Sequence, residues 1–266
     1  MASRYTANDA AAYERLMGRW SGRLADQLIA FAGLAPGDRV LDVGCGTGSL
    51  ALALAARPEP ETIAGLDIAS PYIAFAAERI TDPRVSFVTG DATSMTFPAG
   101  SFDRCYSLLA LNFMSDPAAA LAGMRRVTRP GGTVAVAVWD FSGGLVYQRI
   151  FWDTAAALDP QADRARARHY SSPLTGPGEL ALAFRQAGLR EVCDQSLTIR
   201  IEYENFADYW QPIANAQGPV GDYVNGLAPP DFDRLGEAVR RAYLAGRDDG
   251  PRSMAATAWA ARGIVP

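Results

Sequence analysis

The sequence predicts an α/β protein built on a doubly wound, mostly parallel β-sheet. Between about residues 38 and 140, short apolar runs alternate with helical patterns. Continuous apolar strands are typical of sheets covered on both faces, and helices of about 10 to 15 residues between them are typical of parallel connections. A compact globular protein also fits the composition, because 49% of the 266 residues are hydrophobic and 20% are charged.

The elements of this region follow one another in a regular order. Strands are predicted at five apolar runs, residues 39–43, 62–67, 84–91, 101–109 and 131–140. Ser70 followed by Pro71 predicts an N-cap and a first helical residue, and Asp116 followed by Pro117 predicts the same start for a later helix. Each helix therefore connects two strands.

Helices are also predicted on both sides of this region. Residues 8–17 and 19–32 are expected to form two helices, the second ended by Gly33, that cap an edge of the sheet. After residue 139 the alternation of strands and helices stops. An amphipathic helix is predicted within residues 145–159, with one face formed by Leu145, Ile150, Phe151, Thr154 and Leu158. This segment is interpreted as an insertion.

Two further segments concern the C-terminal part of the chain. Residues 196–203 alternate Leu197, Ile199, Ile201 and Tyr203 with polar side chains, which predicts a strand exposed to water on one side and an antiparallel edge pair. Residues 253–265 are rich in alanine, so local propensity alone favours a helix there.

Charge and composition exclude several classes of protein. The formal net charge of −4 argues against a nucleic-acid partner, which usually requires a basic domain. Neither an apolar run long enough for a membrane helix nor a signal-peptide pattern is present, so we expect a cytoplasmic protein without a membrane partner. Cys45, Cys105 and Cys193 are far apart and the chain has one histidine, which predicts neither a disulfide framework nor a metal site.

A glycine-rich loop follows the first of these strands. Gly44, Gly46 and Gly48 let the backbone come close to a ligand and are expected to point free N–H groups at it. Their spacing differs from the G-x-G-x-x-G pattern of dinucleotide sites. Asp42 lies two residues before the loop, and an ionised carboxylate there would repel a pyrophosphate by about 4 kcal/mol per unit charge at 4 Å. The loop therefore favours a nucleoside with a cationic tail.

Two more carboxylates are predicted at the same edge of the sheet. Asp67 closes the second strand and Asp91 follows the third, where open α/β sheets bind their ligands. Asp67 can accept hydrogen bonds from both hydroxyls of a ribose, and Asp91 can accept one from the exocyclic amine of adenine. Each charge-assisted bond contributes about 1.5–3 kcal/mol. The plain alternatives are an N-cap or turn acid for Asp42, a strand-end turn residue for Asp67 and an ordinary loop aspartate for Asp91.

These segments resemble a known family in their order and spacing. "VLDVGCGTGSLALAL", "GLDIAS", "GDATSMTFPAGSFD" and "RPGGTVAVAVW" resemble the corresponding segments of class I S-adenosylmethionine-dependent methyltransferases, and most of all the small-molecule branch that includes the ubiquinone and menaquinone methyltransferases. The resemblance implies a seven-stranded sheet whose last strand is antiparallel and lies beside the fifth, so residues 254–264 are expected to be a strand. It also implies one domain over residues 1–266, with a helical cap at 1–35, a cofactor-binding half at 36–140 and acceptor-side insertions and final strands at 141–266.

The resemblance further implies a set of residues that bind S-adenosylmethionine. Asp42 and the loop would hold the methionine part, Asp67 the ribose, and the remaining residues the adenine, the sulfonium side and the closing aromatic ring. The set comprises Tyr13, Asp42, Gly44, Cys45, Gly46, Gly48, Asp67, Ile68, Asp91, Ala92 and Leu108. Asn112 occupies a position where many relatives carry a histidine.

Candidates for the chemistry itself are fewer. His169 is the only histidine and could act as a general base toward a hydroxyl substrate, the plain alternative being an exposed or hydrogen-bonded histidine in a linker. Trp139, Tyr147 and Trp152 are candidates for an acceptor pocket, with core packing as the alternative. Three arginines at 164, 166 and 168 are interpreted as a solvated helical face.

The predicted function is S-adenosylmethionine-dependent methyl transfer to a small-molecule acceptor by in-line displacement on an oxygen, nitrogen or carbon nucleophile. A nicotinamide-dependent oxidoreductase and a non-catalytic S-adenosylmethionine-binding protein are the alternatives. The sequence predicts no particular acceptor and no oligomeric state.

Overall fold

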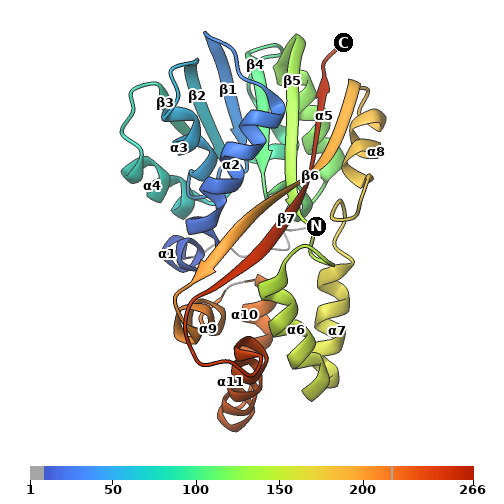
Figure 1. Cartoon of the computed structure of the whole chain (residues 1–266). Coiled ribbons are helices and arrows are strands. Elements are labelled where there is room, and N and C mark those ends of the chain that lie inside the picture. The colour runs from blue at the N-terminus through green and yellow to red at the C-terminus, as the bar shows by residue number, and fades with distance from the viewer. Residues whose placement is uncertain (1–8, 217) are drawn as a thin grey trace.

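The computed structural model describes residues 9–216 and 218–266, and this part of the chain contains a seven-stranded mixed sheet with the order β3-β2-β1-β4-β5-β7-β6 (Figure 1). The strands are β1 (Asp38–Val43), β2 (Pro60–Asp67), β3 (Val85–Thr89), β4 (Phe102–Leu108), β5 (Thr128–Trp139), β6 (Arg190–Tyr203) and β7 (Arg252–Ile264). The pairings from β3 to β5 are all parallel, and β7 is antiparallel to both β5 and β6. The predicted topology is confirmed.

Helices cover both faces of the sheet and one of its ends. They are α1 (Ala10–Tyr13), the π-helix η1 (Glu14–Gly18), α2 (Arg19–Ala32), α3 (Ser49–Ala55), α4 (Ser70–Arg79), α5 (Pro117–Val127), α6 (Val146–Leu158), α7 (Pro160–Tyr170), α8 (Glu179–Gln186), α9 (Phe206–Ala214), α10 (Gly218–Val224) and α11 (Pro229–Leu244). The short 3-10 turns η2 (Ala92–Ser94) and η3 (Leu111–Phe113) follow β3 and β4. None of the helices in residues 9–216 and 218–266 is long and apolar enough to cross a membrane.

Two core clusters, one on each face, show that the sheet is doubly wound. On one face, Leu24 and Leu28 of α2 pack with Leu50 of α3, and these helices lie against β5 to β7 and against β2, respectively. On the other, Leu121 of α5 packs over β4 and β5, and Phe184 of α8 packs over β6 and β7. The central strands β1 and β4 are therefore buried on both faces, which accounts for their continuous apolar sequences, whereas the edge strands β3 and β6 are partly exposed.

The helix starts and ends follow local chemistry. Asp116 is the N-cap of α5 and accepts a hydrogen bond from the Ala119 N–H, as predicted. In α4 the helix begins one residue earlier than predicted, because Ser70 is already helical and Ala69 is the N-cap. The two predicted N-terminal helices are one continuous helical stretch that passes through η1 and ends at Gly33 with φ 81°; residue 8 of the prediction lies outside the described residues.

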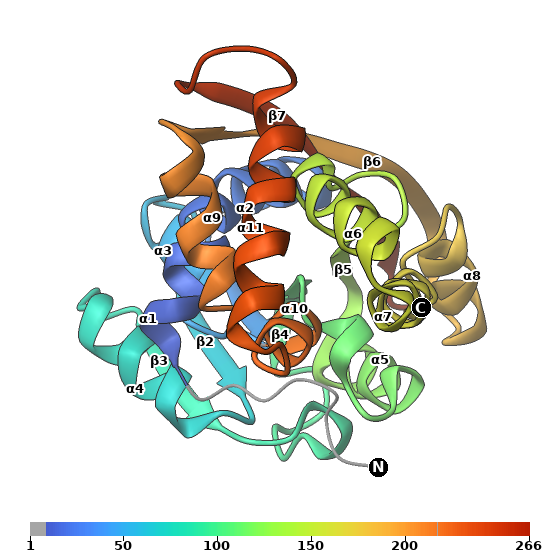
Figure 2. The same cartoon turned by 90° about the horizontal axis from the view of Figure 1, so that it is seen from below.

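A layer of helices lies below the carboxyl ends of the strands. Figures 1 and 2 show α6, α7, α9, α10 and α11 gathered there, with β6 and β7 extending from the sheet into this layer.

The predicted apolar face of α6 is only partly right: Phe151 is buried, but Leu158 is 38% exposed and the polar Gln148 is buried. Because α6 packs against α7, α11 and β7 at once, its buried surface is wider than one stripe and is rotated from the predicted face.

The alanine-rich end of the chain is the strand β7. Leu197, Ile199, Ile201 and Tyr203 of β6 are buried with polar residues between them, which confirms the predicted edge pair. β7 lies between β5 and β6 and is hydrogen-bonded on both sides. These ladders override the helical propensity of alanine, and the small side chains let the core pack close to the strand.

We expect Ala258→Leu to lower the free energy of unfolding by about 1–3 kcal/mol, because Ala258 is fully buried in the core and a larger side chain overpacks it. Urea unfolding followed by circular dichroism measures the change. The control is Ala255→Leu on the partly exposed face of the same strand, which should change stability by less than about 1 kcal/mol. Equal losses in the two variants would contradict this packing.

Candidate functional site

The loop between β1 and α3 can only be built from glycine at its key positions. Gly44, Gly46 and Gly48 have φ of 72°, 53° and 86°, a region that other residues rarely adopt. A Cβ on Gly44 would lie 2.4 Å from the Cβ of Ala110, and one on Gly48 would lie 2.9 Å from the Cδ1 of Ile80. The loop therefore packs tightly at both ends, whereas Gly46 has room beside it.

The loop amides are occupied within the protein, which corrects the expectation that they point free at a ligand. The N–H groups of Gly44 and Cys45 both donate to the Leu66 carbonyl, at 2.7 and 3.0 Å. The Gly46 N–H donates to Asp67 Oδ2 at 2.9 Å, and the Gly48 N–H donates to the Cys45 carbonyl at 2.9 Å. These four amides are thus not available to bind phosphate oxygens.

Asp42 is a buried carboxyl group without a partner. It is 1% exposed, and neither of its side-chain oxygens has a hydrogen-bond partner in the described part of the chain. Burial and, second, the charge of Asp67 raise the pKa of Asp42 to about 8, although the nearby Ala51 amide opposes the shift. Without a ligand Asp42 therefore holds its proton at neutral pH, contrary to the ionised form assumed from the sequence. A cation placed beside it would favour its ionisation.

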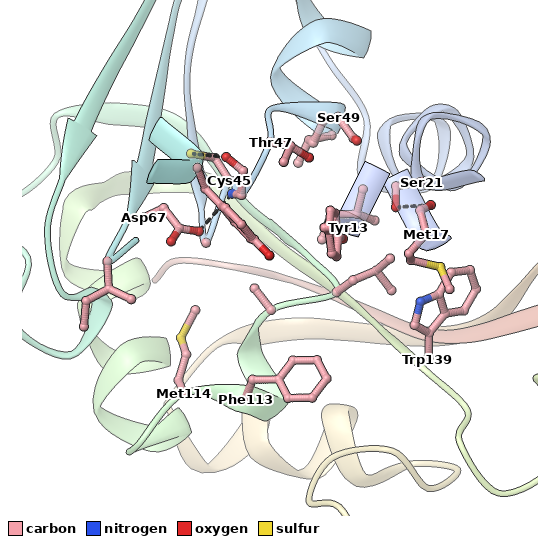
Figure 3. Close-up of a pocket in the computed structure, with 18 of the residues that line it drawn as sticks. Tyr13, Met17, Ser21, Cys45, Thr47, Ser49, Asp67, Phe113, Met114 and Trp139 are labelled. Carbon is pink, nitrogen blue, oxygen red and sulfur yellow. Dashed lines mark hydrogen bonds between the residues drawn. The ribbon is translucent and has the colours of Figure 1, made fainter. Parts of the chain in front are cut away.

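Asp67 is oriented by the backbone around it. Its Oδ2 accepts from the Gly46 N–H at 2.9 Å (Figure 3). Its Oδ1 accepts from the Ala69 N–H at 2.8 Å. Burial raises the pKa of Asp67, and these amides oppose the shift. The carboxylate is thus fixed between the loop and the start of α4, with its geometry set before any ligand binds.

One cavity of about 240 Å³ joins most of the predicted residues. Of the predicted cofactor set, its wall includes Tyr13, Asp42, Gly44, Cys45, Gly46, Asp67, Ile68, Asp91, Ala92 and Leu108. Gly48 is not part of the wall, because it packs behind the loop against α4. Of the predicted acceptor residues, Trp139 and Tyr147 line the same cavity, and so does His169, the predicted general base.

The adenine side of the predicted site combines an apolar surface with a polar rim. Ile68 is 61% exposed, which is unusual for a large aliphatic side chain and leaves a surface on which a flat ring can pack. Asp91 is exposed, and its Oδ1 accepts from both the N–H and the hydroxyl of Thr93, so it also caps η2. The Cys45 thiol is buried and its pKa is raised well above the usual value, so it stays protonated.

The N-terminal helix is tied to the glycine loop by contacts that the sequence did not reveal. The Thr47 hydroxyl donates to the Glu14 carboxylate, which also pairs with Arg79 at 3.1 Å. Glu14 folds over Gly18, where a Cβ would lie 2.2 Å from the Glu14 Oε1. This contact places Tyr13 at the cavity wall, with its ring 5.7 Å from that of Tyr72.

The end of the cavity opposite Asp67 is aromatic. Figure 3 shows Trp139, Phe113 and Met17 on the side away from Cys45 and Asp67. Trp139 is 4% exposed, and its indole nitrogen has no partner among the described residues. Leu109, directly after β4, has φ 62°, a strained value for leucine that is found mostly at functional sites.

His169 lies in the last turn of α7, not in a linker, and it is buried. Its Nε2 is 2.7 Å from Gln148 Oε1, and its ring centroid is 4.1 Å from that of Phe141. Burial lowers the pKa of His169 to about 4, so the ring is neutral at pH 7. A neutral histidine at a cavity wall can accept a proton.

Trp152, a predicted acceptor residue, does not reach the cavity. Trp152 is fully buried and absent from the cavity wall; its ring centroid lies 6.0 Å behind that of His169, so the plain alternative of core packing describes it. Asn112 is buried outside the wall as well.

Arg164 and Arg168 are exposed as expected, and Arg166 pairs with Asp153 at 2.8 Å.

The described residues contain neither a cluster of side chains suited to a metal ion nor a disulfide bond. Within residues 9–216 and 218–266 no cluster of histidine, cysteine and acidic side chains could hold a metal ion. Cys45, Cys105 and Cys193 are free thiols.

Comparison with known proteins agrees with this geometry. A methyltransferase-domain family model matches residues 41–136. A demethylmenaquinone methyltransferase of Roseiflexus castenholzii is 33% identical over 62% of this chain and 73% of its own length. Nocamycin O-methyltransferase of Saccharothrix syringae is 33% identical over 64% of this chain and 65% of its own. A structure of Haemonchus contortus phosphoethanolamine N-methyltransferase 2 has a TM-score of 0.62 at 17% identity, over 99% of this chain and 58% of that one.

The chain belongs to the class I S-adenosylmethionine-dependent methyltransferases, and within them it resembles the quinone methyltransferases. S-Adenosylmethionine is the cofactor of this family. Across four curated relatives, the nocamycin enzyme among them, the chain spans only 42 to 65% of the relative's length.

We expect the ligand-free protein to lose stability as pH rises from about 4 to 8, and Asp42→Asn to remove much of this loss. In that range an unfolded aspartate, with a pKa of about 3.9, has released its proton while folded Asp42 keeps it, so the free energy of unfolding falls with rising pH. The variant should be more stable by up to about 4 kcal/mol at pH 7 and nearly equal to wild type at pH 4.

Thermal and urea unfolding at several pH values between 4 and 8.5 test this expectation. Asp194→Asn, at an exposed position of β6, is the matched control and should keep the pH dependence of the wild type. If Asp42→Asn and wild type show parallel stability profiles over this range, Asp42 does not carry a raised pKa.

Proposed function

We propose that the protein transfers a methyl group from S-adenosylmethionine to a small-molecule acceptor. The observation that carries this proposal is the buried, unpartnered carboxyl of Asp42 beside a glycine loop whose amides are occupied. A buried carboxyl group without a partner costs about 1–3 kcal/mol or more, so it is expected where a ligand supplies the partner. A cationic amino group meets that requirement.

The cavity wall suits the parts of this cofactor. We assign Asp42 and the loop residues Gly44, Cys45 and Gly46 to its methionine end, and Asp67 to its ribose hydroxyls. Ile68 offers an apolar surface to the adenine, with Asp91 and Ala92 at its amino edge. Tyr13 and Leu108 close the remaining sides. Gly48 supports the loop from behind.

The bound cofactor would supply an electrophilic methyl group on a sulfonium leaving group. The chain's own residues have to orient the acceptor, exclude water and take up a proton. The aromatic end of the cavity provides a dry surface, and such positioning can remove about 7–11 kcal/mol of the barrier. His169 is the group that can accept the proton, since it is neutral and lies in the wall.

The two alternatives are distinguished by different features. A nicotinamide-dependent oxidoreductase would need loop amides for its diphosphate, and those of Gly44, Cys45, Gly46 and Gly48 are already bonded. A non-catalytic binding protein would share the cofactor end and lack a productive acceptor end, so only turnover separates it from an enzyme.

Two related points belong to the same proposal. We take residues 1–266 as one methyltransferase domain, with 1–35 as the cap, 36–140 as the cofactor half and 141–266 as the acceptor side. We also take the cytoplasm as its location, because free thiols such as those of Cys45 and Cys105 fit a reducing compartment. Its partner would be the small-molecule acceptor, and nucleic acid and membrane are not proposed as partners.

The test has two stages. Calorimetry with S-adenosylmethionine, S-adenosylhomocysteine and NAD separates the enzyme classes, and tight binding of NAD alone would overturn the proposal. Transfer of radiolabelled methyl groups to a panel of phenols, quinones, amines and carboxylates then separates an enzyme from a binding protein.

We expect Asp67→Ala to weaken S-adenosylmethionine binding at least tenfold, because it removes an acceptor that the backbone holds in place for two hydroxyls. Calorimetry at pH 7.5 measures the dissociation constant, and circular dichroism checks that the variant is folded. The exposed Asp194→Ala is the control and should bind like wild type. An unchanged affinity for Asp67→Ala would exclude this assignment.

We expect His169→Ala to reduce kcat by about 10²- to 10⁴-fold, the usual contribution of a general base, with little effect on cofactor affinity. Because the pKa of His169 is about 4, activity of the wild type should stay constant from about pH 5.5 upward with respect to this group. Steady-state kinetics and calorimetry on the same preparation give both values. Wild-type turnover in the variant would make His169 a bystander.

A further inference from the structure

The acceptor end of the cavity differs from the cofactor end in charge. All carboxylates in the wall, Asp42, Asp67 and Asp91, lie at the cofactor end. No arginine lines the wall in the described residues, and the chain contains no lysine. An anionic acceptor would therefore lose its hydration without gaining a partner, and an ammonium acceptor would find no carboxylate beside it. The acceptor end suits a neutral molecule.

A polar pair breaks the apolar surface at this end. Gln148 is 9% exposed and His169 is 6% exposed, so both are buried, and both line the cavity. Gln148 Oε1 lies 2.7 Å from His169 Nε2, and Gln148 Nε2 donates to the Tyr147 hydroxyl at 2.9 Å. Since an amide oxygen can only accept, the Nε2 of the neutral ring must carry the proton. The lone pair of His169 is then on Nδ1.

The ring and its partner are held in place from several sides. Phe141 lies against the His169 ring at 4.1 Å between centroids, and Trp152 lies 6.0 Å away on another side. Tyr147, which receives the Gln148 amide, is fixed in turn because its carbonyl accepts from the Tyr209 hydroxyl at 2.8 Å. A buried polar group held in this way fixes a tautomer, as the partners of metal-bound and triad histidines do.

We propose that Gln148 is a positioning residue that holds His169 in the Nε2–H tautomer, and that the acceptor is a neutral ring compound methylated on an acidic hydroxyl, a phenol or an enol. This inference rests on the proposed methyl transfer. In the step, the hydroxyl proton passes to His169 Nδ1, the oxygen electron pair forms the bond to the methyl carbon, and the carbon–sulfur bond breaks. The sulfonium charge is lost as the imidazolium charge appears, so the total charge is conserved.

The chemistry of the base selects the kind of acceptor. A neutral amine has its own lone pair and needs no base before transfer, whereas a hydroxyl oxygen becomes a good nucleophile only as its proton leaves. A desolvated imidazole is a weak base, because burial lowers its pKa. Proton transfer to it from an aliphatic hydroxyl, which is about as weak an acid as water, is less favourable by about five to six orders of magnitude than from a phenol with a pKa of about 10.

The tautomer can be measured directly, because His169 is the only histidine in the chain. Protein labelled with ¹⁵N-histidine and freed of any histidine tag should give one pyrrole-type signal for Nε2 and one pyridine-type signal for Nδ1 at pH 7. Adding 1-naphthol to the complex with S-adenosylhomocysteine should move the Nδ1 signal, whereas decahydro-1-naphthol should not. A protonated Nδ1 in the free protein would overturn the inference whatever the activity.

Variants of Gln148 test its role in the reaction. Gln148→Met keeps the volume and loses the acceptor, so kcat with 1-naphthol should fall at least tenfold while KM changes less than threefold. Gln148→Glu keeps an acceptor and adds a negative charge beside the ring, which should raise the pKa of His169 and move the acidic limb of kcat/KM upward by at least one pH unit. Gln186→Met, at an exposed position of α8, is the control.

The outcomes separate this inference from the proposed function. Transfer to 1-naphthol at least 100-fold faster than to decahydro-1-naphthol or to 1-naphthylamine supports it. Equal rates for these three acceptors, or wild-type kcat and pH profile in Gln148→Met, would refute it while methyl transfer itself stands. If S-adenosylmethionine does not bind to wild type in calorimetry, the proposed function fails instead.

Discussion

The buried carboxyl of Asp42 is the constraint on which the cofactor end of this molecule depends. Folding places it behind the glycine loop with 1% exposure and without a hydrogen-bond partner, and Asp67 lies near enough to raise its pKa further. A protein tolerates such a group only where the cost is offset, and in the proposed function the offset is a ligand that carries positive charge. Stability of the empty protein and affinity for its cofactor are therefore opposed at this one position.

The loop in front of Asp42 uses its N–H groups to hold parts of the protein in place, and not to bind a ligand directly. Its N–H groups hold the loop to Leu66 and orient the Asp67 carboxylate. The loop thus positions acceptors for hydroxyl and ammonium donors, and it leaves few donors for phosphates. This arrangement distinguishes the site from the phosphate-binding loops that begin in the same place on similar sheets.

Secondary structure was predicted correctly from the sequence where a local pattern of residues, or the resemblance to a family of known fold, was enough to determine it. Continuous apolar runs and the Asp116–Pro117 start predicted strands and a helix that the structure contains. The α6 face was predicted only in part, because its burial is set by α7, α11 and β7, whose positions are not encoded in the spacing of residues 145–159. The alanine-rich β7 was predicted as a strand only through the family resemblance, since its ladders with β5 and β6 outweigh local propensity.

The sequence by itself determined the order of strands and helices between about residues 38 and 140 and the carboxylates at the ends of those strands, because hydrophobic periodicity and glycine chemistry act within a few residues of chain. Only the tertiary structure decided that Asp42 is protonated without a ligand, that the loop amides are occupied, and that His169 meets Gln148 beside Phe141. Protonation and tautomer depend on burial and on partners brought from distant segments, and no single stretch of sequence carries that information.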